Sequence, residues 1–103
     1  MAIVAADLDR HGAVLGDCDP EAHWQRDGLD RRARSIITLT ALTALGRENE
    51  IELHVRGALN NGLSPEEIGE VLLHTAVYAG VPVANGAFAI AQRVFDERAA
   101  AGD

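Results

Sequence analysis

Cysteine and serine are scarce in this chain, and their scarcity excludes several kinds of chemistry. The 103 residues include a single cysteine, Cys18, so no internal disulfide can form and no zinc site can be built from several thiolates. The two serines are Ser35 and Ser64, and Ser64 is better placed as a helix cap than as a nucleophile. A Ser-His-Asp triad therefore has no support, and the cysteine content is typical of a reducing compartment.

Positive charge and long apolar runs are scarce as well. Asp and Glu number 16 against 9 Lys and Arg, which gives a formal net charge of −7. Such a surface repels nucleic acid and anionic lipid, so neither is expected as a partner. The longest apolar run, residues 36–45, is interrupted by threonines and is too short to span a bilayer. The first residues lack the basic region of a secretory signal, so we expect a cytoplasmic protein.

Apolar residues, by contrast, make up 48% of the chain and recur at helical spacing. This pattern predicts an all-α fold in a single domain spanning residues 1–103. The clearest helix begins at Ser64, which with Pro65 and Glu67 forms an N-terminal capping signal, and it ends at Gly80. Three further helices are expected over residues 31–45, 48–59 and 83–98.

The two ends of the chain carry weaker signals. A short helix is expected over residues 4–15, and a helical turn around Trp24 over residues 21–26. The alanine-rich tail, residues 99–103, is expected to fray. Four small helices with alanine-rich stripes leave apolar faces to cover, so we expect a homo-oligomer.

A group of chemically useful side chains lies in the middle of the chain. Glu50 precedes His54 by four residues and Arg47 precedes Glu50 by three, so a cation, a carboxylate and an imidazole share one helix face. This face suggests a pocket for an anionic small molecule, with His54 and Glu50 as catalytic candidates and Arg47 as a substrate-binding candidate. Spacing alone favours a plainer interpretation, an exposed ion pair beside a half-buried histidine.

Three further residues are candidates for the same pocket. His74 flanks the apolar stripe of its helix and is expected to point inward, although a core-edge histidine bonded to a backbone carbonyl is the plainer interpretation. Arg34 belongs to an arginine-rich segment and would bind a carboxylate bidentately if it points inward. Trp24 is either a pocket wall or, as its type favours, a core anchor. No metal site is expected, because the histidines lack metal-binding spacing on one helix.

Three motifs, taken in order, resemble the carboxymuconolactone decarboxylase family. They are Leu-Asp-Arg-Arg at residues 29–32, His-x-Arg-x-Ala-x-Asn-Asn-Gly at residues 54–62, and Tyr-Ala-Gly-Val-Pro at residues 78–82. The resemblance covers residues 24–97 as the family core, with residues 1–23 as a divergent N-terminal segment. It implies an all-helical fold shared with AhpD-type proteins, assembled as a hexamer of three dimers or as a trimer.

The resemblance also implies a reaction that needs no cofactor. Family members remove CO2 from 4-carboxymuconolactone to give 3-oxoadipate enol-lactone, a step of protocatechuate breakdown in the β-ketoadipate pathway. On this basis His54 would donate the proton or stabilise the oxyanion, and Glu50 would orient it. Arg34 or Arg47 would hold the remaining carboxylate, with His74 and Trp24 nearby.

Two departures from the family pattern bear on this function. The peroxidase branch carries Cys-x-x-Cys ahead of its histidine, and the corresponding positions here are Arg47 and Glu50, so disulfide-based peroxide chemistry is ruled out at this site. In the family, an aromatic-rich helix separates the Ala-Val-Leu-Gly-Asp motif, here residues 13–17, from the segment around Trp24. In this chain only a few residues lie between the motif and Trp24, too few for that helix. Alternatives are therefore action on another cyclic acid, as a decarboxylase or isomerase, a non-catalytic helical oligomer module, and a redox partner using Cys18.

Overall fold

The computed structural model describes residues 20–102, and the chain divides into two compact units, Met1–Asp30 and Arg31–Asp103. In the first unit the described helix is α2 (Pro20–Trp24), which confirms the helical turn predicted around Trp24. The helix predicted over residues 4–15 and the thiol of Cys18 lie outside the described residues. Over residues 20–102 the secondary structure is helical, with no strand, as the apolar spacing predicts.

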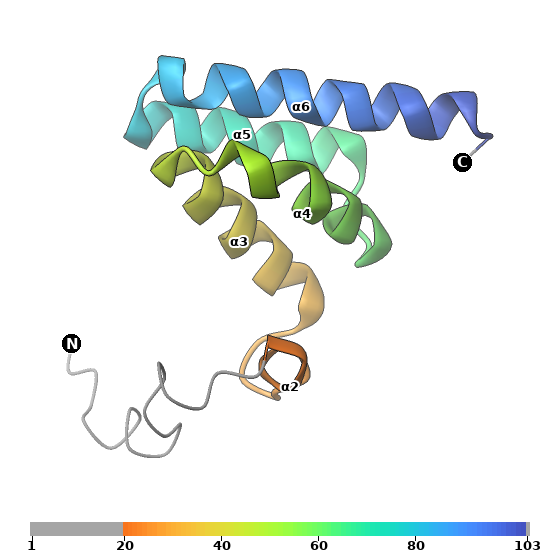
Figure 1. Cartoon of the computed structure of the whole chain (residues 1–103). Helices are drawn as coiled ribbons and strands as arrows, with labels where there is room; N and C mark the ends of the chain where they lie inside the picture. Colours follow the sequence, from red (N-terminus) through yellow and green to blue (C-terminus); the bar gives the residue numbers. More distant parts are fainter. Residues whose placement is uncertain (1–19, 103) are drawn as a thin grey trace. The chain divides into compact units, whose positions relative to one another are not determined.

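The second unit consists of four helices. They are α3 (Arg31–Leu45), α4 (Glu48–Asn60), α5 (Pro65–Ala79) and α6 (Val81–Ala100). Helices α5 and α6 run side by side, and α3 and α4 lie across them (Figure 1). Each helix packs chiefly against two others, in the order α3–α4–α6–α5 and back to α3. Two layers of two helices therefore enclose one core.

The boundaries of α5 follow from its capping residues. Ser64 Oγ accepts a hydrogen bond from the backbone N–H of Glu67 at 3.1 Å, and the Glu67 carboxylate accepts one from the Ser64 N–H at 3.0 Å. These two bonds satisfy donors that a helix start otherwise leaves unpaired. The helix ends at Gly80, whose φ of 106° is a conformation that favours glycine. The capping signal in the sequence is confirmed in full.

Helix α6 is longer than predicted at both ends. It begins at Val81, directly after Gly80. Pro82 is tolerated in the first turn, because a backbone N–H there would have no partner within the helix, so the N–H that proline lacks is not missed. It continues through Ala100, so the prediction that Ala99 and Ala100 fray is wrong. Alanine has the highest intrinsic helix propensity, which explains why the tail extends the helix.

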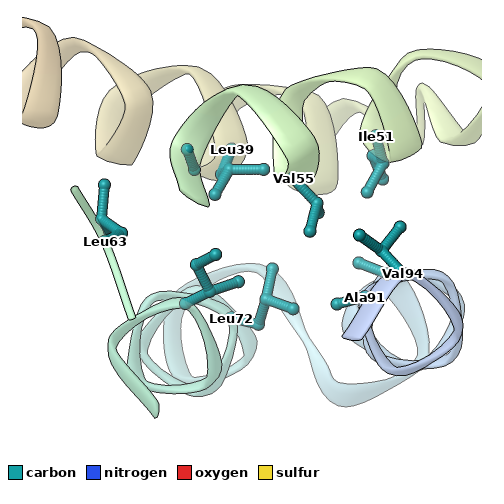
Figure 2. Packing of buried hydrophobic residues seen from close by; sticks show 10 residues of the cluster. Leu39, Ile51, Val55, Leu63, Leu72, Ala91 and Val94 are labelled. Carbon is teal, nitrogen blue, oxygen red and sulfur yellow. The ribbon is translucent and has the colours of Figure 1, made fainter. Parts of the chain in front are cut away.

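The core lies between the two layers. Leu39, Ile51 and Val55 from the α3–α4 layer meet Leu72 and Val94 from the α5–α6 layer, and all five side chains are fully buried (Figure 2). One hydroxyl group, that of Thr43, is buried in α3 without a hydrogen-bond partner. The apolar residues that recur at helical spacing along α4 and α5 thus form the faces that pack in the core.

Apolar side chains also remain exposed outside this core. Leu45 and Leu53 lie on the α3–α4 layer and are about two-thirds exposed. On α5 the exposed fraction reaches 71% for Val77 and 81% for Tyr78. These side chains belong to helix faces that have no helix packed on them within the second unit. No helix within residues 20–102 is long and apolar enough to cross a membrane.

Candidate functional site

One side of α4 carries the three predicted residues of the central group. Arg47 directly precedes α4, Glu50 lies in its first turn, and His54 lies one turn further on. The spacing of three and four residues places them on the same side of the helix. His54 is half-buried at the edge of the core face, while Arg47, Glu50 and Leu53 are exposed. We call the side chains of Arg47, Glu50, Leu53 and His54 the α4 flank.

Hydrogen bonds beyond the C-terminal end of α4 hold it against α3. The side-chain amide of Asn61 donates to Ser35 Oγ at 3.0 Å, and its oxygen accepts from Arg31 Nε at 3.2 Å. Ser35 itself is buried in the first turns of α3. Neither Asn61, which the sequence offers only as part of a family motif, nor Ser35 was predicted to have this role. The signal for this contact is the pair Asn60-Asn61, because the side chain of the second asparagine can form hydrogen bonds with a neighbouring helix.

The other side of α4 is tied to α6 by charged groups. Glu52 accepts hydrogen bonds from Arg93 at 2.9 Å and from Arg56 at 3.3 Å, and Arg56 also pairs with Glu97. The hydrogen bond from Arg93, followed by that from Arg56, holds the pKa of the Glu52 carboxyl below its usual value. The bond to Glu97 raises the pKa of Arg56 further above its usual value. These pairs join α4 to α6 on the side of α4 away from the α4 flank, while the buried Ile51 and Val55 face the core.

Arg34 and Trp24 occupy different compact units. Arg34 is 9% exposed and lies in the first turns of α3, so its side chain is largely withdrawn from solvent. Trp24 ends α2 in the Met1–Asp30 unit and is half-buried. The roles of Arg34 in binding a carboxylate and of Trp24 in lining a pocket stay predictions.

The predicted inward orientation of His74 is wrong. Its side chain is exposed, and its ring lies 5.0 Å from that of Tyr78, tilted by 51°. His74 follows the fully buried Leu72 by two positions, about 200° around the helix, so it points away from the core. Arg47, Glu50 and His54 therefore share one side of α4, and His74 does not lie with them.

A surface depression occurs elsewhere on the second unit. It is open and is lined by Arg56, Asn60, Glu97, Arg98 and Ala101. Arg98 donates hydrogen bonds there to the Asn60 side chain at 2.9 Å and to the Arg56 carbonyl at 3.4 Å. No predicted site residue lines it, and its two guanidinium groups already have partners. Within residues 20–102, no group of three His, Cys, Asp or Glu side chains is placed to hold a metal ion.

Comparison with known proteins connects this chain to decarboxylases. A profile of the Carboxymuconolactone decarboxylase family matches residues 13–93. The 4-carboxymuconolactone decarboxylase of Acinetobacter baylyi is 45% identical over 74 residues, which cover 72% of this chain and 55% of that protein. The nitrosuccinic acid decarboxylase of Metarhizium robertsii is 41% identical over 80 residues, covering 78% and 56% respectively. The chain thus spans about half the length of these relatives.

Proposed function

Because this chain belongs to the carboxymuconolactone decarboxylase family, we propose that it is a carboxy-lyase acting on a small anionic substrate. The preferred substrate is 4-carboxymuconolactone, the product is 3-oxoadipate enol-lactone, and the setting is protocatechuate breakdown. The identity of 45% to a relative of that name supports this choice. The observation that carries the proposal is the α4 flank, where a half-buried imidazole has a carboxylate and a guanidinium within two turns.

The substrate itself explains how this reaction proceeds without a cofactor. When the carboxylate leaves, its electron pair flows through the ring double bond into the lactone carbonyl and forms an oxygen-centred anion. The protein then has to bind the carboxylate that stays, stabilise the oxyanion and return a proton to carbon. Each task needs one polar group in a site with little water, and the α4 flank and Arg34 supply such groups.

The roles follow from the chemistry of each side chain. His54 donates the proton, because an imidazole is the side chain most often used as a general acid and this one borders the core. Glu50, one turn earlier, orients the imidazole. Arg34 or Arg47 holds the carboxylate that remains on the substrate, since a guanidinium matches a carboxylate with two parallel hydrogen bonds.

The second named relative favours a broader substrate class as the alternative. Nitrosuccinic acid has two carboxyl groups and a nitro group, and loss of CO2 beside the nitro group also leaves the charge on oxygen. Both substrates are thus dicarboxylic acids that carry their own electron acceptor. A related acid of this class, decarboxylated or isomerised, is therefore the second candidate function, and a non-catalytic helical module is the third.

Release of CO2 from 4-carboxymuconolactone tests the proposal directly. The wild-type chain should turn the lactone over, and His54→Ala should lower kcat/KM by about 10²- to 10⁴-fold, the usual contribution of a positioned general acid. His23→Ala, an exposed histidine on α2, is the matched control and should retain full activity. A loss below about tenfold for His54→Ala would remove this residue from the mechanism. A ligand-induced rise in melting temperature without turnover would instead favour binding alone.

We also propose that the chain works as a homo-oligomer, a hexamer or trimer by its resemblance to the family. The exposed apolar side chains on α3, α4 and α5 support this, because monomeric proteins rarely leave several such faces uncovered.

A further inference from the structure

The predicted site residues lie on two separate surfaces of one copy of the chain. The α4 flank borders the core on the α3–α4 layer. His74 lies on the side of α5 that is turned away from the core, and Leu72, on the opposite side, faces the α3–α4 layer (Figure 2). Two imidazoles placed in this way cannot both contact one small substrate within a single copy.

The α4 flank is also uncovered. Its Leu53 is 67% exposed, and Leu45 at the end of α3 is equally exposed. Decarboxylation of an anion is favoured in a site from which water is excluded, since the charged carboxylate must give way to neutral CO2. If the proposed function holds, this site is incomplete until another surface closes over it.

The outer side of α5 has the composition that such a cover needs. Glu70, Leu73, His74, Val77 and Tyr78 follow one another there at helical spacing, and all five are exposed. We call these five side chains the α5 outer stripe. It is largely apolar, so it would exclude water, and it presents an imidazole and a phenol beside each other at 5.0 Å.

The charges of the two surfaces are complementary. The polar members of the α4 flank are, in order, a guanidinium, a carboxylate and an imidazole, and those of the α5 outer stripe are a carboxylate, an imidazole and a phenol. When the α4 flank of one copy is laid along the α5 outer stripe of another, Glu50 at the centre of the flank lies opposite His74 at the centre of the stripe. This holds for parallel and for antiparallel helices. In one direction Arg47 then meets Glu70, and in the other Arg47 meets the ring of Tyr78, which is attractive as well.

We propose that the α5 outer stripe of a second copy covers the α4 flank of the first, so that each active site is shared between two copies. His74 and Tyr78 of one copy then complete the site that contains His54 of the next. The two surfaces differ, and every copy has both, so each copy can supply a cover to one neighbour and receive one in return. This proposal rests on the proposed function for its chemistry, but the contact itself can be tested without any activity.

A disulfide between copies tests the contact. The full chain with Cys18→Ser is prepared in two forms with different tags, one with Glu50→Cys and one with His74→Cys, and the two are mixed and oxidised with copper phenanthroline. A disulfide that joins the two tags is expected, because opposed side chains bring the sulfur atoms within bonding range. Gln92→Cys, exposed on α6, replaces His74→Cys as the matched control and should give no such product. Absence of the mixed disulfide, or an equal yield with the control, overturns the proposal.

Complementation tests the shared site. His54→Ala and His74→Ala should each lose most lactone decarboxylation, and chains mixed in equal amounts should recover about a quarter of the wild-type activity, because a quarter of the sites receive both histidines. A mixed assembly without recovery means that both histidines serve the same copy, which overturns the shared site. Failure of the proposed function gives a different result: the wild type releases no CO2, and the disulfide then decides the contact alone.

Discussion

Gly86 on α6 lies against the side-chain carboxylate of Glu48, the first residue of α4. A Cβ built at position 86 would overlap the Glu48 carboxylate, so this close contact exists only because residue 86 has no side chain. No pattern in the sequence reveals the contact, because it depends on how α4 packs on α6. Replacing Gly86 with alanine should therefore have two opposing effects on stability. Alanine favours the helix more than glycine does, but its methyl group displaces Glu48.

Gly86→Ala tests which of these effects is larger. The overlapping atoms are the far end of a flexible, exposed side chain, so Glu48 can swing aside at little cost. We expect the gain in helix propensity to prevail and the free energy of unfolding to rise by about 0.5–1 kcal/mol, measured by urea denaturation. Gly69→Ala on α5 is the matched control, because a Cβ there meets nothing within 4 Å. A loss of stability at position 86 with a gain at position 69 would show that Glu48 is held in place.

For single residues, the sequence predicted whether a side chain is buried better than it predicted the side of the helix on which that side chain lies. His54, three residues from Ile51 and four from Ala58, was expected at the border of the core and is half-buried there. His74 was expected to point inward because it is close to buried residues in sequence, but two positions along a helix lead to the opposite side. The hydrogen bonds of Asn61 join segments far apart in the chain, which local spacing cannot indicate.

Each helix of the second unit was predicted from the sequence to within a few residues, because local signals fix where helices begin and end. Gly46, Gly62 and Gly80 have φ values of 72°, 100° and 106°, in the region that favours glycine, and each lies at a predicted helix end. The ends of α6 were missed for local reasons too, since proline is tolerated in a first turn and alanine prolongs a helix. What the sequence did not predict is which outer faces of the helices stay uncovered.

The cap of α5 makes a measurable contribution to stability. Ser64→Ala removes the acceptor for the Glu67 N–H and should lower the free energy of unfolding by about 1 kcal/mol, within a range of about 0.5–2 kcal/mol. Ser64→Asp keeps an acceptor oxygen at this position and should retain most of the stability. Equal losses for both variants in urea denaturation would mean that the serine contributes through packing and not through its hydrogen bond.

The ion pairs between α4 and α6 should make stability depend on acid pH. Because the folded-state pKa of Glu52 lies below the ordinary value of 4.5, its contribution is present above that value and is lost as pH falls through the folded-state pKa. Glu52→Gln should therefore melt at a lower temperature than the wild type near neutral pH, and the difference should vanish in acid. The effect should be small, since exposed ion pairs contribute little.

Repeating this comparison in an Arg93→Gln variant tests which side chain lowers the pKa of Glu52. In an Arg93→Gln chain the effect of Glu52→Gln on melting temperature should shrink, because the hydrogen bond from Arg93 is the largest cause of the shift. An unchanged effect in that background would contradict the assignment to Arg93.

For the whole molecule, the uncovered apolar faces predict that stability depends on protein concentration. An assembly that buries Val77 and its neighbours on α5 is favoured by mass action, so the melting temperature should rise as the protein is concentrated. Val77→Asp introduces a charge into that face and should abolish this rise while leaving the helical circular dichroism intact. A wild-type melting temperature that stays constant over about a hundredfold range of concentration would contradict the prediction.

The reversal between α5 and α6 has a mechanical consequence. One residue, Gly80, separates the last residue of α5 from the first residue of α6. A connection this short leaves no slack in the backbone, and α5 and α6 pack closely on each other, so we expect the two helices to move as one unit. A molecule that docks on the outer side of α5 therefore also restrains α6, whose Arg93 and Glu97 pair with side chains of α4.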